Sequence, residues 1–138
     1  MRREDVDSAR RRRETTGRMA EFAAAAALMA KGYRILARRV RTPQGEIDLI
    51  AVRGRRIAFI EVKQRASLAE AEDSLRPTQV ARIQRSAEHW IARNRFYRDY
   101  DIGLDAILVV PWTWPAHRPD ALQDGPMDWR LRPKRTRW

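Results

Sequence analysis

The chain has 138 residues and a formal net charge of +11, and almost all of its basic residues are arginines. This length allows one domain with one hydrophobic core. Cysteine is absent, which excludes disulfides, thiol nucleophiles and cysteine-ligated zinc. No apolar run approaches the roughly 20 residues of a membrane-spanning helix, so we expect a cytoplasmic protein without a membrane partner. The charge favours nucleic acid as the partner, although arginine-rich usage also follows from genomic base composition.

The N-terminal segment, residues 1–16, is strongly basic. It contains an arginine run at residues 10–13 and no aromatic side chain. We expect a flexible arm that is separate from the core. Such an arm either binds phosphates or is an unstructured, solvated tail.

A helix is predicted over residues 17–31. Its apolar positions have helical spacing, and Gly32 supplies a C-terminal stop. The alanine run at residues 23–27 would let this helix pack close to a sheet. Glu21 lies near the helix start, where the helix dipole favours a carboxylate. The apolar stripe consists of Met19, Phe22, Ala26 and Met29.

The first strand is predicted over residues 33–41, and residues 42–45 turn the chain into the second. Three arginines make the far end of this strand strongly basic. They either flank a phosphate track or protect an edge strand from aggregation. These arginines are Arg38, Arg39 and Arg41.

The apolar runs 45–50 and 57–63 predict a β-hairpin. A two-residue loop of Gly54 and Arg55 puts glycine at the first central position of a type II′ turn, which is a favoured hairpin geometry. A turn centred one residue earlier is an alternative. A three-residue loop would break the facing pattern described next.

Two carboxylates and a lysine lie inside these apolar strands. With the turn at residues 54–55, Asp48 lies directly opposite Glu61, with Cβ atoms about 4.5–5.5 Å apart, and the two charges repel unless a cation lies between them. With the earlier turn, Asp48 faces Phe59 and becomes a diagonal neighbour of Glu61. Lys63 follows two residues after Glu61 and therefore shares its face.

This set of side chains predicts a divalent cation. Mg²⁺ takes carboxylate oxygens, keeps several waters and contacts phosphate oxygens. A neighbouring lysine can orient an attacking water and offset charge on the phosphate. The expected reaction is phosphodiester hydrolysis. The simpler alternative is an ordinary hairpin with a salt bridge between Glu61 and Lys63.

The second half of the chain predicts a helix and a strand. Residues 64–77 form a polar loop with a short helical piece at 68–71, and residues 78–95 form the second helix. One face of this helix is apolar, with Val80, Ile83, Ala87, Trp90 and Ile91. Another face either follows a nucleic-acid backbone or is solvated, and it carries Arg82, Arg85, His89 and Arg93. The last apolar strand covers residues 104–110, and we expect its Asp105 to be structural.

Residues 112–138 form an extension rich in tryptophan, proline and arginine, which we expect to pack on the domain formed by residues 17–111. Its aromatic side chains, including Trp112 and Trp114, can stack on unpaired bases, cap the core or form a dimer contact. A short edge strand is predicted from the alternation of Met127, Trp129 and Leu131.

Several motifs together resemble a known group of nucleases. Asp48, followed thirteen residues later by Glu61-Val62-Lys63, resembles the D…E-x-K signature of the PD-(D/E)XK nuclease superfamily. A longer set resembles the YraN-like bacterial family, which is related to Holliday-junction resolvase-like nucleases. This resemblance covers residues 17–111. The set comprises GRMAE at 17–21, KGYRIL at 31–36, GEIDLI at 45–50, FIEVK at 59–63, and Arg65.

The resemblance implies an α/β fold with a restriction-endonuclease-like αβββαβ core, in which helices flank a central mixed sheet. It assigns Asp48 and Glu61 as ligands of Mg²⁺ or Mn²⁺, joined by the backbone carbonyl of Val62. Lys63 is then the catalytic lysine. Glu21, on the first helix, becomes an additional acidic residue near the metal.

The resemblance also bears on nucleic-acid contacts. Relatives usually carry a lysine early in the second helix, where this chain has Gln79. Gln79 and Gln64 can each contact phosphate or a water without supplying charge. An ordinary role on the helix surface is an equally good interpretation of Gln79. The full set assigned to nucleic acid is Arg38, Arg39, Arg41, Gln64, Arg65, Gln79 and Arg82.

The expected function is metal-dependent cleavage of nucleic acid, with structured or branched DNA favoured over RNA. One alternative is a non-catalytic nucleic-acid-binding protein with the same fold, acting in a repair, recombination or uptake assembly. Another is an RNA-associated basic protein whose acidic residues bind structural cations. A homodimer is one arrangement to consider, because branched-DNA resolvases act as dimers that make two symmetric cuts.

Overall fold

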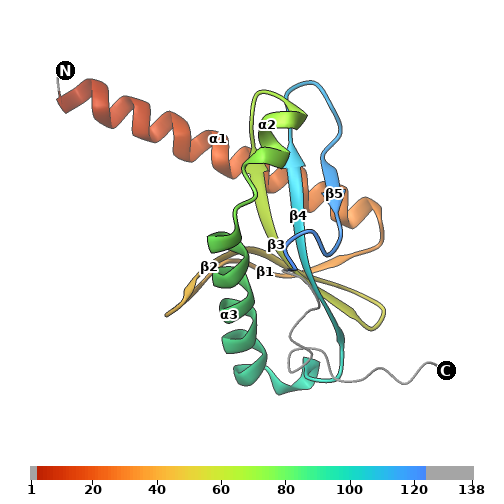
Figure 1. The fold of residues 1–138 in the computed structure, drawn as a ribbon. Helices are drawn as coiled ribbons and strands as arrows, with labels where there is room; N and C mark the ends of the chain where they lie inside the picture. The colour runs from red at the N-terminus through yellow and green to blue at the C-terminus, as the bar shows by residue number, and fades with distance from the viewer. Residues whose placement is uncertain (1–2, 124–138) are drawn as a thin grey trace.

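A computed structural model describes residues 3–123, apart from the side chains of residues 12–16 and of Thr78. The elements in chain order are α1 (Arg3–Ala30), β1 (Arg34–Thr42), β2 (Gly45–Arg53), β3 (Arg56–Gln64), α2 (Leu68–Asp73), α3 (Pro77–Arg93), the 3₁₀ helix η1 (Arg95–Tyr97), β4 (Asp101–Val109) and β5 (Ala116–Arg118) (Figure 1). No helix in this part of the chain is both long enough and apolar enough to cross a membrane.

The five strands form one mixed sheet in the order β1-β2-β3-β4-β5. The β3–β4 pair is parallel, whereas the other three neighbouring pairs are antiparallel. The helix α3 makes the crossover that a parallel pair requires. This arrangement confirms the predicted αβββαβ order and the restriction-endonuclease-like core, to which β5 adds a short edge strand.

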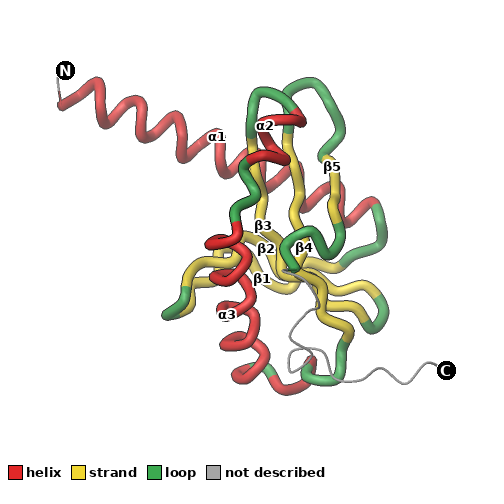
Figure 2. The backbone as a smooth tube through the Cα atoms, viewed as in Figure 1, coloured by secondary structure: helices red, strands yellow, loops and turns green. Residues whose placement is uncertain are grey.

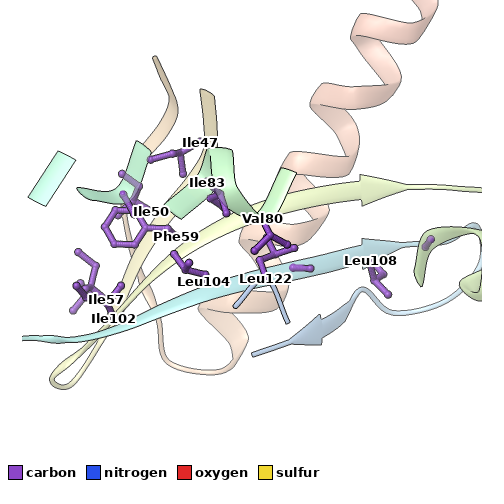
Figure 3. Close-up of a cluster of buried hydrophobic side chains, with 14 residues drawn as sticks. Ile47, Ile50, Ile57, Phe59, Val80, Ile83, Ile102, Leu104, Leu108 and Leu122 are labelled. Carbon is purple, nitrogen blue, oxygen red and sulfur yellow. The ribbon is translucent and has the colours of Figure 1, made fainter. Parts of the chain in front are cut away.

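Apolar side chains cover both faces of the sheet. On one face, a cluster around Phe59 packs beneath α2 and α3, with Val80 and Ile83 contributed by α3 (Figure 3). On the opposite face, α1 covers a second cluster that includes Leu28 and Ile60. Helices therefore lie on both sides of the sheet (Figure 2), and the strands between them are buried as the apolar runs predict.

The face of α1 that contacts the sheet consists mainly of small residues. Ala24 and Ala25 are fully buried together with Leu28, so the predicted role of the alanine run in close packing is confirmed. The apolar stripe that indicated the helix is not the packed face, because long side chains there would hold the helix away from the sheet. The stripe residues are exposed: Met19 by 66%, Phe22 by 60% and Met29 by 53%.

The N-terminal segment, for which we expected an arm separate from the core, is helical. Helix α1 begins at Arg3 and not at Gly17, and its first half extends away from the sheet (Figure 1). Glu4 and Asp5 lie in the first turn, where carboxylates interact favourably with the positive end of the helix dipole. No proline or glycine interrupts the helix before Gly17.

The segment after β4 returns along the sheet edge. Strand β5 pairs with β4, and Leu122 is fully buried. The side chains of Trp112 and Trp114 are exposed, so neither tryptophan caps the core. The predicted edge strand of Met127, Trp129 and Leu131 lies outside the described residues.

A polar network surrounds Asp105, which is fully buried in β4. Both terminal nitrogens of Arg56 donate to its carboxylate, at 2.8 and 2.7 Å. The Nε2 atom of His117 lies 2.8 Å from the same carboxylate, and the backbone N–H of Asp120 donates to it at 2.8 Å. Burial alone would raise the pKa of Asp105, but the hydrogen bonds from Arg56 and His117 hold it below its ordinary value. Asp105 therefore has the structural role that we expected.

Gly103 gives Arg56 the space to reach Asp105. A Cβ atom at this position would overlap the Arg56 guanidinium and would lie 2.8 Å from Asp105 Oδ1. Moving the guanidinium would break the charge pairing of a fully buried carboxylate, which is strongly destabilising.

We therefore expect Gly103→Ala to lower the free energy of unfolding by about 3 kcal/mol, measured by chemical denaturation. Gly17→Ala is the matched control, because a Cβ atom there would meet nothing within 4 Å. That control should gain up to about 1 kcal/mol from the higher helix propensity of alanine. An unchanged unfolding midpoint for Gly103→Ala would contradict the role assigned to the network.

Candidate active site

The β2–β3 hairpin has the predicted two-residue turn. Arg53 pairs with Arg56, and Gly54 has a φ of +59°. Arg55 is not among the non-glycine residues with positive φ, so the turn has glycine at its first central position as in type II′. The register from the turn to the Leu49–Ile60 pair follows the predicted count without a bulge.

Asp48 lies immediately beyond the last paired residues of this ladder. Its Oδ2 accepts a hydrogen bond of 2.8 Å from the backbone N–H of Val62. In an extended strand the N–H and C=O of one residue point to the same side, so the Val62 carbonyl also lies on the Asp48 side of β3. Beyond Leu49 and Ile60 the side chain of Asp48, rather than its backbone, bridges the two strands.

Asp48 and Glu61 line one cleft, as the predicted facing pattern requires. The cleft has a volume of about 450 Å³ and lies between the β1–β2 turn, the end of β3 and the first turns of α3. Its walls comprise Thr42, Pro43, Gln44, Gly45, Glu46, Asp48, Glu61, Gln79, Arg82 and Ile83.

The charge of Asp48 is poorly compensated. Burial raises its pKa to about 6, the hydrogen bond from Val62 opposes this shift, and the charges of Glu61, Glu21 and Glu46 add to it. None of the described cationic side chains forms an ion pair with Asp48. A carboxylate in this environment gains free energy from any cation that enters the cleft.

Lys63 is buried next to Glu61. Its Nζ atom lies 3.0 Å from Glu61 Oε1, and the lysine as a whole is only 9% exposed. The ion pair that the simpler hairpin interpretation predicted is therefore present. It also holds the ammonium group beside the carboxylate of Glu61, although Lys63 is not among the residues that line the cleft.

Glu21 lies outside the cleft. Arg39 Nε donates to Glu21 Oε2 at 2.9 Å, and both residues line a separate hollow with Arg18, Phe22 and Arg38. Arg39 has a φ of +50°, an uncommon conformation for a residue other than glycine. Glu21 is still near enough for its charge to raise the pKa of Asp48. Within the described residues, no group of three or more His, Cys, Asp or Glu side chains is arranged to hold a metal ion.

The residues assigned to nucleic acid fall into separate groups. Gln79 and Arg82 line the cleft, whereas Arg38 and Arg39 line the hollow beside Glu21. Arg41 is exposed, with its Nε atom 3.9 Å from Glu46 Oε2. Two others lie at the end of β3, where Arg65 donates to the carbonyl oxygen of Gln64 at 2.6 Å.

The sequence interpretation missed Glu46 and the function of Gly45. Glu46 lies two residues before Asp48. Because side chains two residues apart on a strand share a face, the sequence could have predicted that Glu46 lies in the same cleft. Gly45 has a φ of +151°, and a Cβ atom there would lie 2.6 Å from Arg82 Cγ. The glycine therefore allows Arg82 and α3 to approach the β1–β2 turn.

The comparisons with known proteins identify the family of this chain. The model of the "Uncharacterised protein family UPF0102" matches residues 20–109. The chain is 51% identical over 111 residues to a UPF0102 protein of Rhodopseudomonas palustris (strain BisB5), covering 80% of this chain and 85% of the relative. It is 50% identical over 117 residues to UPF0102 protein Mmar10_3014 of Maricaulis maris, covering 85% and 92%. The chain belongs to the UPF0102 family, a PD-(D/E)XK nuclease-like group, and the YraN-like resemblance is confirmed.

The raised pKa of Asp48 predicts a pH-dependent cost in stability. Its folded-state pKa of about 6 lies above the ordinary value of 3.8, so between these values the folded protein holds a proton that the unfolded chain releases. Stability therefore falls as the pH rises through this window. Asp48→Asn removes this cost, and the variant should be more stable than wild type above pH ~6 by up to about 3 kcal/mol.

Chemical denaturation at about pH 4 and about pH 8 measures this difference, which should nearly vanish at the lower pH. Asp73→Asn, at an exposed position on α2, is the control for loss of a surface carboxylate. An equal change in stability at both pH values would contradict the claim that ionisation of Asp48 destabilises the fold.

Proposed function

We propose that this protein is a metal-dependent nuclease that hydrolyses phosphodiester bonds, with structured or branched DNA as the preferred substrate. The observation that carries the proposal is the buried carboxylate of Asp48, which lies in a cleft shared with Glu61 and has no ion-pair partner in the described part of the chain. Perturbed carboxylates in clefts are typical of functional sites.

The donor atoms around Asp48 fit a hard divalent cation. The carboxylates of Asp48 and Glu61 and the carbonyl of Val62 are oxygen donors, which Mg²⁺ and Mn²⁺ prefer. One or two carboxylates are sufficient for Mg²⁺, because waters and substrate phosphates complete its coordination. A bound cation supplies Lewis-acid activation of water and neutralises charge on the phosphate.

The neighbouring side chains have complementary roles in this proposal. Lys63 donates a hydrogen bond to the attacking water and offsets negative charge that develops on the phosphate. Arg82 and Gln79, on the opposite wall of the cleft, bind phosphate oxygens of the substrate. Glu21 supports the cation only if its ion pair with Arg39 opens.

A second candidate function is nucleic-acid binding without cleavage. Two carboxylates near the cleft already have cationic partners, since Glu61 pairs with Lys63 and Glu21 pairs with Arg39. In a binding protein these pairs would be permanent, and the basic residues would act through phosphate contacts alone.

Cleavage of labelled single-stranded, duplex and branched DNA and of RNA, with Mg²⁺ or Mn²⁺, tests the proposal. We expect metal-dependent cutting by wild type, and a loss of at least about 100-fold in both Asp48→Asn and Lys63→Ala. Glu70→Gln, at an exposed position on α2, should cut normally.

Two outcomes of this assay would contradict the nuclease proposal. Cutting that survives in Asp48→Asn would place the activity at another site or in a contaminant. Binding that persists in chelator, without cutting by any of the proteins, would favour the non-catalytic function.

A further inference from the structure

A cluster of aromatic side chains lies in the segment that follows α3. Phe96, in η1, is 78% exposed. Its ring lies 5.0 Å from that of Tyr97, and Tyr97 lies 5.0 Å from Tyr100. Tyr97 also contacts Trp90, which packs against the core. Phe96 is therefore held on a rigid aromatic base while most of its own surface faces solvent.

Arginines surround this cluster. The guanidinium of Arg55 lies 4.7 Å from the centre of the Tyr100 ring. Arg95, the first residue of η1, and Arg98, which follows η1, are exposed. Between residues 82 and 98 the chain has five arginines and a single carboxylate, Glu88. Asp99 follows, and its Oδ2 lies 3.9 Å from Arg98 Nε. The segment around Phe96 thus carries more arginines than carboxylates, with Asp101 as a second acidic residue beside Asp99.

A basic stripe on α3 connects the cleft with this cluster. Arg82 lies in the cleft wall, and Arg85, His89 and Arg93 follow at spacings of three and four residues, which places them along one side of the helix. Arg93 Nε donates to His89 Nε2 at 2.9 Å, so these two side chains are held together. At 1.5 Å per residue the stripe extends about 17 Å. Figure 1 shows α3 leading directly into η1.

We propose that this surface binds a single-stranded segment of the nucleic acid, with phosphates along the α3 stripe and an unpaired base stacked on Phe96. The inference rests on the proposed function, because it takes the cleft as the place of the scissile phosphate. Phosphates of an extended single strand are farther apart than the roughly 3.4 Å rise of a duplex strand, so a stripe of about 17 Å spans a few nucleotides. The preferred substrate is therefore a duplex or junction with a single-stranded extension of at least this length.

The chemistry of the surface favours a single strand over a duplex or a protein. Base faces are accessible only where the strands are unpaired, and an exposed aromatic ring gains stacking energy from any base. Within a duplex the bases stack on one another, so Phe96 would contribute little. The excess of arginines suits a continuous phosphate chain, and stacking on an aromatic ring tolerates any base.

Fluorescence anisotropy with the full chain in chelator tests the inference without cleavage. The probes are a blunt duplex and duplexes with extensions of two, five and ten nucleotides. We expect wild-type affinity to rise with the first few nucleotides of extension and then to level off. Phe96→Ala should lose about tenfold in affinity for the longer extensions and little for the blunt duplex, whereas Phe96→Trp should retain tight binding.

The matched control is Met29→Ala, which removes another exposed apolar side chain, on α1. It should bind every probe as wild type does. The inference is overturned if wild type binds blunt and extended duplexes equally, or if Met29→Ala and Phe96→Ala lose the same affinity.

The two proposals fail in different ways. Extension-dependent binding that needs Phe96, without any metal-dependent cutting, would support the binding surface and reject the nuclease. If cutting requires Asp48 but Phe96→Ala binds every probe as wild type does, the nuclease proposal is supported and the single-strand-binding surface is rejected.

Discussion

The two-residue turn at Gly54 fixes the geometry on which the rest of the candidate site depends. Strand side chains alternate between the two faces, so a shift of one residue between β2 and β3 would move Asp48 and Glu61 to opposite faces. The positive φ of Gly54 permits the tight turn, and the resulting register brings both carboxylates and Lys63 to the face covered by α3. The parallel pairing of β3 with β4 then requires the crossover that carries Arg82 to the same cleft.

Two buried aspartates in one sheet show how their surroundings separate structure from function. Asp105 has Arg56 and His117 as partners, its pKa is lowered, and its charge is satisfied within the fold. Among the described residues Asp48 accepts one hydrogen bond, from the backbone of Val62, and its pKa is raised by burial and by nearby carboxylates. The charge of Asp105 is neutralised within the fold, whereas ionisation of Asp48 lowers the stability of the folded protein. Such a cost is expected where a ligand supplies the missing charge.

The sequence predicted the strands and the hairpin register well, because glycine at a turn and period-two alternation are local signals. It predicted the wrong packed face of α1, since the residues with the largest apolar side chains, such as Phe22, were not those small enough to approach the sheet. The partners of charged residues were also hidden: nothing local indicates that Arg56 reaches Asp105 or that Arg39 holds Glu21. Those contacts join residues far apart in sequence and depend on how helices and strands pack, which hydropathy patterns do not encode.

The central claim is that the unpaired charge of Asp48 is the place for a divalent cation. Anomalous diffraction from crystals of the protein grown with Mn²⁺ would test it most directly. The account predicts an anomalous peak bound by the carboxylates of Asp48 and Glu61, and none at Asp105, whose charge is already compensated. A well-ordered cleft without manganese, in crystals that bind the ion elsewhere, would contradict it.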